Sequence, residues 1–138
     1  MTRRPPTRSV DPQFWRGRRD EARAFSLAAR EAMDLASPGT SASPIVSQIV
    51  LAVIAYSDSL TAKRAQVVNQ QDHAGAVRLL RDVLRSRLPD AQEKAFRRIL
   101  RVKDEAQYGA RAMLLEEARK LLADLDSFIH FIEGLLLE

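Results

Sequence analysis

The apolar residues of segment 44–66 fall on nearly every side of a helix, and this pattern constrains the fold more than any other feature of the chain. A helix that is apolar all round has to be buried, so we expect it at the centre of the protein. Ser43 and Pro44 mark its start, with serine as the N-cap and proline at the first helical position. Residues 44–66 are therefore predicted to be the central helix of a bundle.

Four further segments carry apolar residues at helical spacing. No segment has a sustained two-residue alternation and glycine is scarce, so no sheet is expected. Pro38, Pro89 and Gly109 mark breaks between helices. The predicted helices span residues 13–36, 44–66, 72–87, 90–108 and 114–137. Together they predict an all-α fold, a five-helix, mostly up-and-down antiparallel bundle.

The length of 138 residues fits one domain with an uneven charge. Residues 1–12 hold prolines among arginines and are predicted to be a flexible basic leader, followed by a single helical-bundle domain over residues 13–138. Residues 1–30 contain eight arginines against three acidic residues, a net charge of +5. Clustered arginines favour contact with nucleic-acid phosphates, and a solvated, solubilising face is the alternative. The candidate contacts are Arg16, Arg18, Arg19 and Arg23.

The chain has no cysteine and only two histidines. Disulfides, thiolate chemistry and cysteine-based zinc sites are excluded, and neither a metal nor a cofactor is expected. The longest unbroken apolar stretch, residues 49–56, is far shorter than the roughly 20 residues that cross a bilayer. We therefore expect a soluble, cytoplasmic protein with no membrane partner.

Polar and ionisable residues interrupt the apolar stripes of the predicted helices. His73 precedes Val77 by four positions, so it lies on the inner stripe of the third helix. Lys103 follows Ile99 by four positions and lies on the inner stripe of the fourth. The two helices should form a hairpin around Pro89, which places His73 and Lys103 at about the same level.

Asp58 gives the central helix its own inward polar group, because it follows Leu51 by seven positions and Ile54 by four. Polar side chains on inner stripes suggest a site, since apolar residues alone can build the core of a bundle. We expect these groups to converge near one end of the bundle. The predicted cleft comprises Asp58, Asp72, His73, Lys103, Asp104 and Tyr108.

A structural role is the alternative for each of these residues. Asp72 would cap the third helix. Asp58 and Lys103 would form a buried ion pair that fixes the register of two helices. His73 would donate a hydrogen bond to a backbone carbonyl or a carboxylate, and Tyr108 would pack its ring in the core with its hydroxyl at the rim.

The sequence resembles the HEPN superfamily over about residues 44–136. The likeness lies in residues 55–60 (AYSDSL), residues 71–73 (QDH), Leu100, Lys103 and residues 107–109 (QYG). The resemblance implies a helical bundle that commonly forms homodimers. Members include metal-independent ribonucleases, many of them toxins or defence proteins of toxin-antitoxin type. Others are non-catalytic partners of small nucleotidyltransferases that bind RNA or nucleotides.

Catalytic members of that superfamily use an arginine followed, after four to six residues, by a histidine. Lys103, Asp104 and Tyr108 stand at the matching positions, so the spacing is kept while both principal residues differ. Lysine lacks the bidentate fork of arginine, and tyrosine, with a pKa of about 10, exchanges protons poorly near neutrality. The resemblance therefore implies a non-catalytic, dimeric module that binds RNA, a nucleotide or a partner protein. The alternative is an atypical metal-independent ribonuclease with His73, Lys103 and Tyr108 as catalytic candidates.

Overall fold

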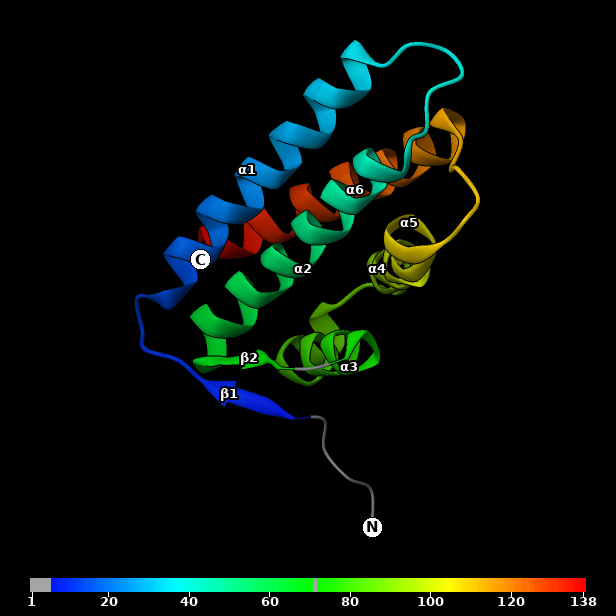
Figure 1. Ribbon diagram of the computed structural model, residues 1–138. Helices are drawn as coiled ribbons and strands as arrows, with labels where there is room; N and C mark the ends of the chain where they lie inside the picture. The colour runs from blue at the N-terminus through cyan, green and yellow to red at the C-terminus, as the bar shows by residue number, and fades with distance from the viewer. Residues whose placement is uncertain (1–5, 71) are drawn as a thin grey trace.

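Helix α2 (Ser43–Ala65) lies at the centre of the computed structural model, which describes residues 6–70 and 72–138 (Figure 1). Side chains on most of its surface are buried, among them Ile49, Val53 and Leu60. The surrounding helices are α1 (Phe14–Leu35), α3 (His73–Leu84), α4 (Asp90–Arg101), α5 (Lys103–Tyr108) and α6 (Leu115–Leu136), with a short 3-10 helix, η1 (Arg85–Arg87). The predicted all-α bundle is confirmed.

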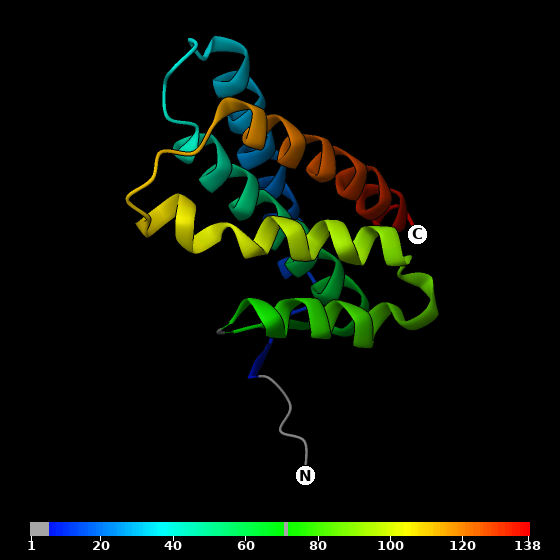
Figure 2. The ribbon, with the colours of Figure 1, turned by 90° about the vertical axis from the view of Figure 1, so that its right-hand side faces the viewer.

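Neighbouring helices along the chain tend to reverse direction. Helices α1 and α2 lie side by side and run in opposite directions (Figure 1), and α3 and α4 form an antiparallel hairpin (Figure 2). Helix α6 packs against both α2 and α4. The largest buried side chains, Tyr56, Phe96 and Phe128, come from these three helices, so the core lies between them.

The residues predicted to start and end the first two helices lie at the observed helix ends, but Ser43 has a different role from the one expected. Helix α1 ends at Leu35, just before the predicted break at Pro38. Pro44 lies in the first turn of α2, but Ser43 is already inside the helix and is not its N-cap. The Ser43 hydroxyl instead accepts a hydrogen bond from the Met113 backbone N–H at 3.3 Å. Ser43 therefore ties α2 to the segment that precedes α6.

A two-stranded antiparallel sheet is present although no sheet was expected. Strand β1 (Thr7–Ser9) pairs with β2 (Val67–Asn69), which follows α2 directly. Three residues are too few to display an alternating pattern, which is why the sequence did not reveal them. Residues 7–9 therefore do not form the flexible leader predicted for residues 1–12, and residues 1–5 lie outside the described residues.

The predicted helix over residues 90–108 is divided at Val102 into α4 and α5. Val102 has a ψ near 0°, which interrupts the helical hydrogen bonds between the two parts. Its side chain and that of Ala106 are half-buried against the core, and α5 packs on α2. The break lets α5 follow the central helix, and it changes the direction of residues beyond Arg101.

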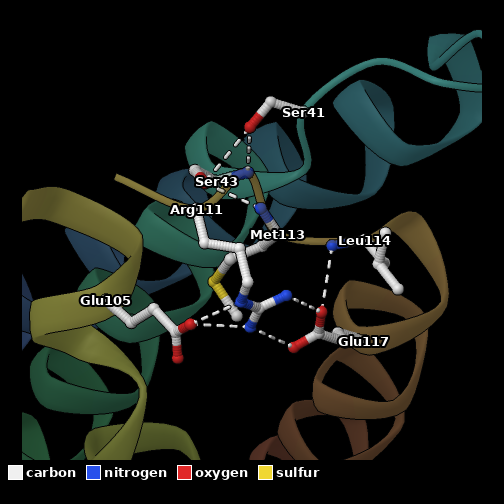
Figure 3. A network of polar contacts seen from close by, with 7 residues as sticks. All are labelled: Ser41, Ser43, Glu105, Arg111, Met113, Leu114 and Glu117. Carbon is white, nitrogen blue, oxygen red and sulfur yellow. Dashed lines mark hydrogen bonds and ion pairs between the residues drawn. The ribbon is translucent and has the colours of Figure 1, made fainter. Parts of the chain in front are cut away.

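The loop between α5 and α6 is held by Arg111, which contacts both helices (Figure 3). Its guanidinium bonds Glu105 of α5 at 2.7 Å and Glu117 of α6 at 2.8 Å. The Met113 carbonyl accepts a hydrogen bond of 2.8 Å from the backbone N–H of Ala42. These contacts fix α5 and the start of α6 against the first turn of α2.

Gly109 ends α5, and we expect Gly109→Ala to destabilise the protein. A Cβ atom at this position would lie 2.6 Å from the Glu105 carbonyl oxygen, a backbone atom that cannot rotate away. Forcing the two apart should lower the free energy of unfolding by about 1–3 kcal/mol. Urea denaturation followed by circular dichroism measures this change.

Gly134→Ala is the matched control, since Gly134 lies inside α6 with no atom near its would-be Cβ. Alanine favours a helix interior over glycine by roughly 1 kcal/mol, so this variant should be more stable than the wild type. Equal effects of the two substitutions would contradict the steric explanation for Gly109.

Among the described residues, α2 is the one helix that is long and apolar enough to cross a membrane. Within its most apolar window, 72% of the residues are buried inside the bundle. The core helix of a soluble protein has this property. The apolar character of α2 is thus accounted for by its central position.

Candidate functional site

The structure brings together four of the six residues predicted to form the cleft. Charges on Lys103, Asp104 and Asp72 all act on His73, which lies at the first position of α3. Lys103, the first residue of α5, is thus close enough for its charge to act on His73, in agreement with the level that the predicted hairpin gave to the two residues. Tyr108 and Asp58 do not join this group, and each is described below.

Tyr108 points to solvent, with 78% of its surface exposed. Tyr108 follows Lys103 by five positions, about 140° around a helix, so helical phase already places it away from the inner stripe that Lys103 continues. Tyr108 is therefore neither a core ring nor a member of the His73 cluster. Lys103 itself is half-buried.

Asp72 caps α3, which was its structural alternative. Its carboxylate accepts a hydrogen bond of 2.6 Å from the Gly75 backbone N–H. This bond fixes the first turn of α3 and thereby the backbone of His73. Burial and the Lys103 charge lower the pKa of His73, although the charges of Asp104 and Asp72 act in the opposite direction. The imidazole is therefore neutral near pH 7.

His73 borders an open groove of about 220 Å³ between α3 and α4. The groove is lined by His73, Ala74, Val77, Arg97, Leu100 and Arg101. Val77 and Leu100 form its buried floor, whereas Arg97 and Arg101 are exposed, one helical turn apart. The groove thus has an apolar base and a cationic edge.

The two guanidinium groups of the groove have no close carboxylate partners among the described residues. Arg97 reaches Glu93 only at 3.8 Å, and Glu93 is already bonded by Arg81. Arg101 has no carboxylate partner among the described residues. Exposed guanidinium groups without close partners can bind phosphate or carboxylate through paired hydrogen bonds. An imidazole beside them adds a further donor or acceptor.

The arginines of the groove were not among the residues singled out in the sequence, although a signal for them was present. Residues 73–108 contain nine Lys and Arg against five Asp and Glu, a net charge of +4. The acidic C-terminal part of the chain offsets this excess in the overall total. The basic character therefore belongs to the α3–α5 region as well as to the leader and α1.

Asp58 lies on the side of α2 that faces α1, not on the side of the groove. Its carboxylate is 3.4 Å from the guanidinium of Arg18, and its side chain is 17% exposed. Burial raises the pKa of Asp58 to about 6, although Arg18 and Arg8 partly oppose this effect. The alternative prediction of an Asp58–Lys103 pair is wrong in its partner, because the ion pair forms with Arg18.

Helices α1, α2 and α6 are joined by a polar network that the sequence did not indicate. Two guanidinium nitrogens of Arg23, Nε and Nη2, donate to the Glu133 carboxylate at 2.8 Å, and the hydroxyl of the buried Tyr56 donates to Glu133 at 2.9 Å. The hydrogen bond from Arg23 lowers the pKa of Glu133, and burial opposes this effect only in part. Burial raises the pKa of Tyr56. Glu133 stays ionised and Tyr56 stays protonated, so the network is structural.

The four arginines predicted to contact nucleic acid differ in their freedom to do so. Arg18 and Arg23 are held by Asp58 and Glu133, and Arg19 bonds its neighbour Asp20 at 3.2 Å. Arg16 is exposed, and no carboxylate is bonded to it in the described part of the chain. The guanidinium groups of Arg16 and Arg19 also lie over the ring of Trp15.

Across residues 6–70 and 72–138, no group of three His, Cys, Asp or Glu side chains is arranged to hold a metal ion. Neither a protein-family model nor a curated protein matches this chain. The likeness to the HEPN superfamily stays a prediction.

Proposed function

We propose that this protein is a binding module for single-stranded RNA, with the phosphate backbone lying along the groove between α3 and α4. The observation that carries the proposal is the cationic edge formed by Arg97 and Arg101 beside His73. Single-stranded nucleic acids are bound by positively charged grooves that follow the backbone. The homodimer and the nucleotidyltransferase-type partner implied by the resemblance remain part of this proposal.

The shape of the groove supports binding over enclosure of a small molecule. It is open to solvent, and its two exposed arginines lie one helical turn apart on the same side of α4, so a single strand can contact both. Nearby exposed cations on α3 and α4, Arg78 and Lys94, extend the positive surface beyond the groove. A flexible polyanion can use all of these charges at once.

Arg101→Gln is expected to weaken RNA binding several-fold. Each lost contact with a phosphate of single-stranded RNA should reduce the slope of log affinity against log salt by ~0.7. Fluorescence anisotropy of a labelled 12-nucleotide RNA, repeated at several salt concentrations, measures both quantities. Arg119→Gln, which removes another exposed arginine, on α6, is the control and should bind as the wild type does. Equal losses of RNA affinity in the two variants would show that the groove is not the binding site.

A metal-independent ribonuclease is the second candidate, favoured by the neutral imidazole of His73 next to the Lys103 charge. A neutral imidazole can accept a proton from a ribose hydroxyl, and a lysine can stabilise the charge of the phosphate. Incubation of the protein with RNA and a chelator distinguishes this activity. Cleavage that persists in chelator and is lost in His73→Ala would replace the binding module with the ribonuclease.

A further inference from the structure

A second cationic surface lies at the opposite end of the hairpin from His73, where four chain segments meet. The N-terminal turns of α1, the C-terminal turn of α2, η1 and the end of α6 come together there (Figures 1 and 2). Trp15 lies on the α1 side of this surface, with cationic groups of Arg16, Arg19 and Lys63 at 5.6, 5.1 and 4.8 Å from its ring. Three cations around one indole concentrate positive charge on this side of the protein.

Glu138 bridges two further arginines of this surface. Its Oε1 atom lies 3.2 Å from the guanidinium of Arg64 and 2.9 Å from that of Arg87. The Arg87 guanidinium nitrogen is also 2.9 Å from Oε2. Without the carboxylate, the two guanidinium groups would face one another with their charges uncompensated. We call Arg64 and Arg87, together with Trp15 and the three cations around its ring, the cradle.

Positive charges outnumber negative charges in and around the cradle. Five cations, Arg16, Arg19, Lys63, Arg64 and Arg87, are accompanied among the described residues by Asp20, Glu138 and, near Arg19, Glu133, which is also paired with Arg23. Arg87 lies in η1, which begins with a strained residue. Arg85 has a φ of 51°, a value that residues with a side chain rarely adopt. Lys63 is anchored by the Leu136 carbonyl, so its ammonium group is fixed beside the ring.

We propose that the cradle is a second binding site for the phosphates of single-stranded nucleic acid, and that the Glu138 carboxylate occupies it as an internal competitor. A carboxylate and a phosphate present similar pairs of oxygens to a guanidinium. Glu138 is half exposed and is held only by surface ion pairs, which contribute little to stability. A phosphate can therefore displace it.

Nucleic acid fits the cradle better than an acidic peptide does, because of Trp15. Sites for single strands combine cations for the backbone with an aromatic ring and arginine planes on which bases stack. The ligand class rests on the proposed function, whereas the location and the competing carboxylate do not. The cradle and the groove lie at opposite ends of α3 and can be tested separately.

Glu138→Gln is expected to increase affinity for a labelled 12-nucleotide single-stranded RNA several-fold. Each phosphate that enters the cradle should steepen the salt dependence of log affinity by ~0.7. Glu31→Gln is the control, because it makes the same charge change on an exposed carboxylate in the distant half of α1. The double variant Glu138→Gln with Arg87→Gln should lose the gain, and circular dichroism verifies that all variants are folded.

The outcomes separate the cradle from the groove. A gain in Glu138→Gln that Arg87→Gln removes supports the cradle, even if Arg101→Gln has no effect and the groove proposal fails. Equal behaviour of Glu138→Gln and Glu31→Gln overturns the cradle, whatever the groove variants do. An acidic peptide that binds Glu138→Gln while RNA does not would likewise overturn the nucleic-acid assignment.

Discussion

Phe128→Ala is expected to lower the free energy of unfolding by about 3–5 kcal/mol. The Phe128 ring is fully buried in α6 and lies 5.1 Å from the ring of Phe96 in α4, measured between centroids. Truncation removes the buried apolar area and leaves a cavity between the two helices, which the rest of the core can fill only in part. Urea denaturation of the purified variant measures the loss.

Leu137→Ala is the control for this prediction, because Leu137 is a large apolar residue near the end of α6 that is 90% exposed. Its removal should change the free energy of unfolding by less than about 0.5 kcal/mol. Because Phe96 immediately precedes Arg97, loosening of α4 in Phe128→Ala should also weaken RNA binding. A stable Phe128→Ala variant would mean that the core is not centred between α4 and α6.

The helices could be predicted because their signals are local. An all-round apolar pattern identifies α2, and Pro89 separates α3 from α4 in the structure as it does in the sequence. The break at Val102 has no such signal, since no proline or glycine stands there and packing against α2 decides it. The pairing of β1 with β2 joins segments about 60 residues apart in the sequence, a contact that helical periodicity does not encode.

The candidate site could be predicted only in part, for a related reason. Helical phase and the hairpin count predicted that His73 and Lys103 lie at about the same level, and the Lys103 charge does act on His73, because only a short stretch of chain with one turn at Pro89 separates them. The phase of Asp58 was ambiguous, since a helix buried on most sides has several inward directions and Asp58 faces α1. Partner choice depends on the tertiary fold, as the 110-residue separation of Arg23 and Glu133 illustrates.

The ion pair of Asp58 and Arg18 does not by itself indicate that Asp58 stabilises the protein. Transfer of a carboxylate into a largely buried position costs free energy that a single partner at 3.4 Å repays incompletely. The raised pKa of about 6 expresses this balance, because burial outweighs the attraction of Arg18 and Arg8. Asp58 in its ionised form is therefore a net cost to folding near neutral pH.

Asp58→Asn is accordingly expected to stabilise the protein at pH 8, by about 2–3 kcal/mol. The folded protein holds the Asp58 proton more tightly than the unfolded chain, whose aspartate pKa is near 4. The wild type therefore keeps the full stability of the protonated state below about pH 4 and loses it as the pH rises to about 6. Asparagine cannot ionise, so the advantage of the variant should vanish by pH 4.

Urea denaturation of both proteins at pH 4, 6 and 8 tests this dependence on pH. Asp82→Asn, at an exposed position on α3, is the control and should change stability by less than about 0.5 kcal/mol at each pH. An Asp58→Asn variant that is less stable than the wild type at pH 8 would show that attraction to Arg18 outweighs burial. If the gain is found, burial of the ionised Asp58 carboxylate between α1 and α2 costs more free energy than its ion pair with Arg18 returns.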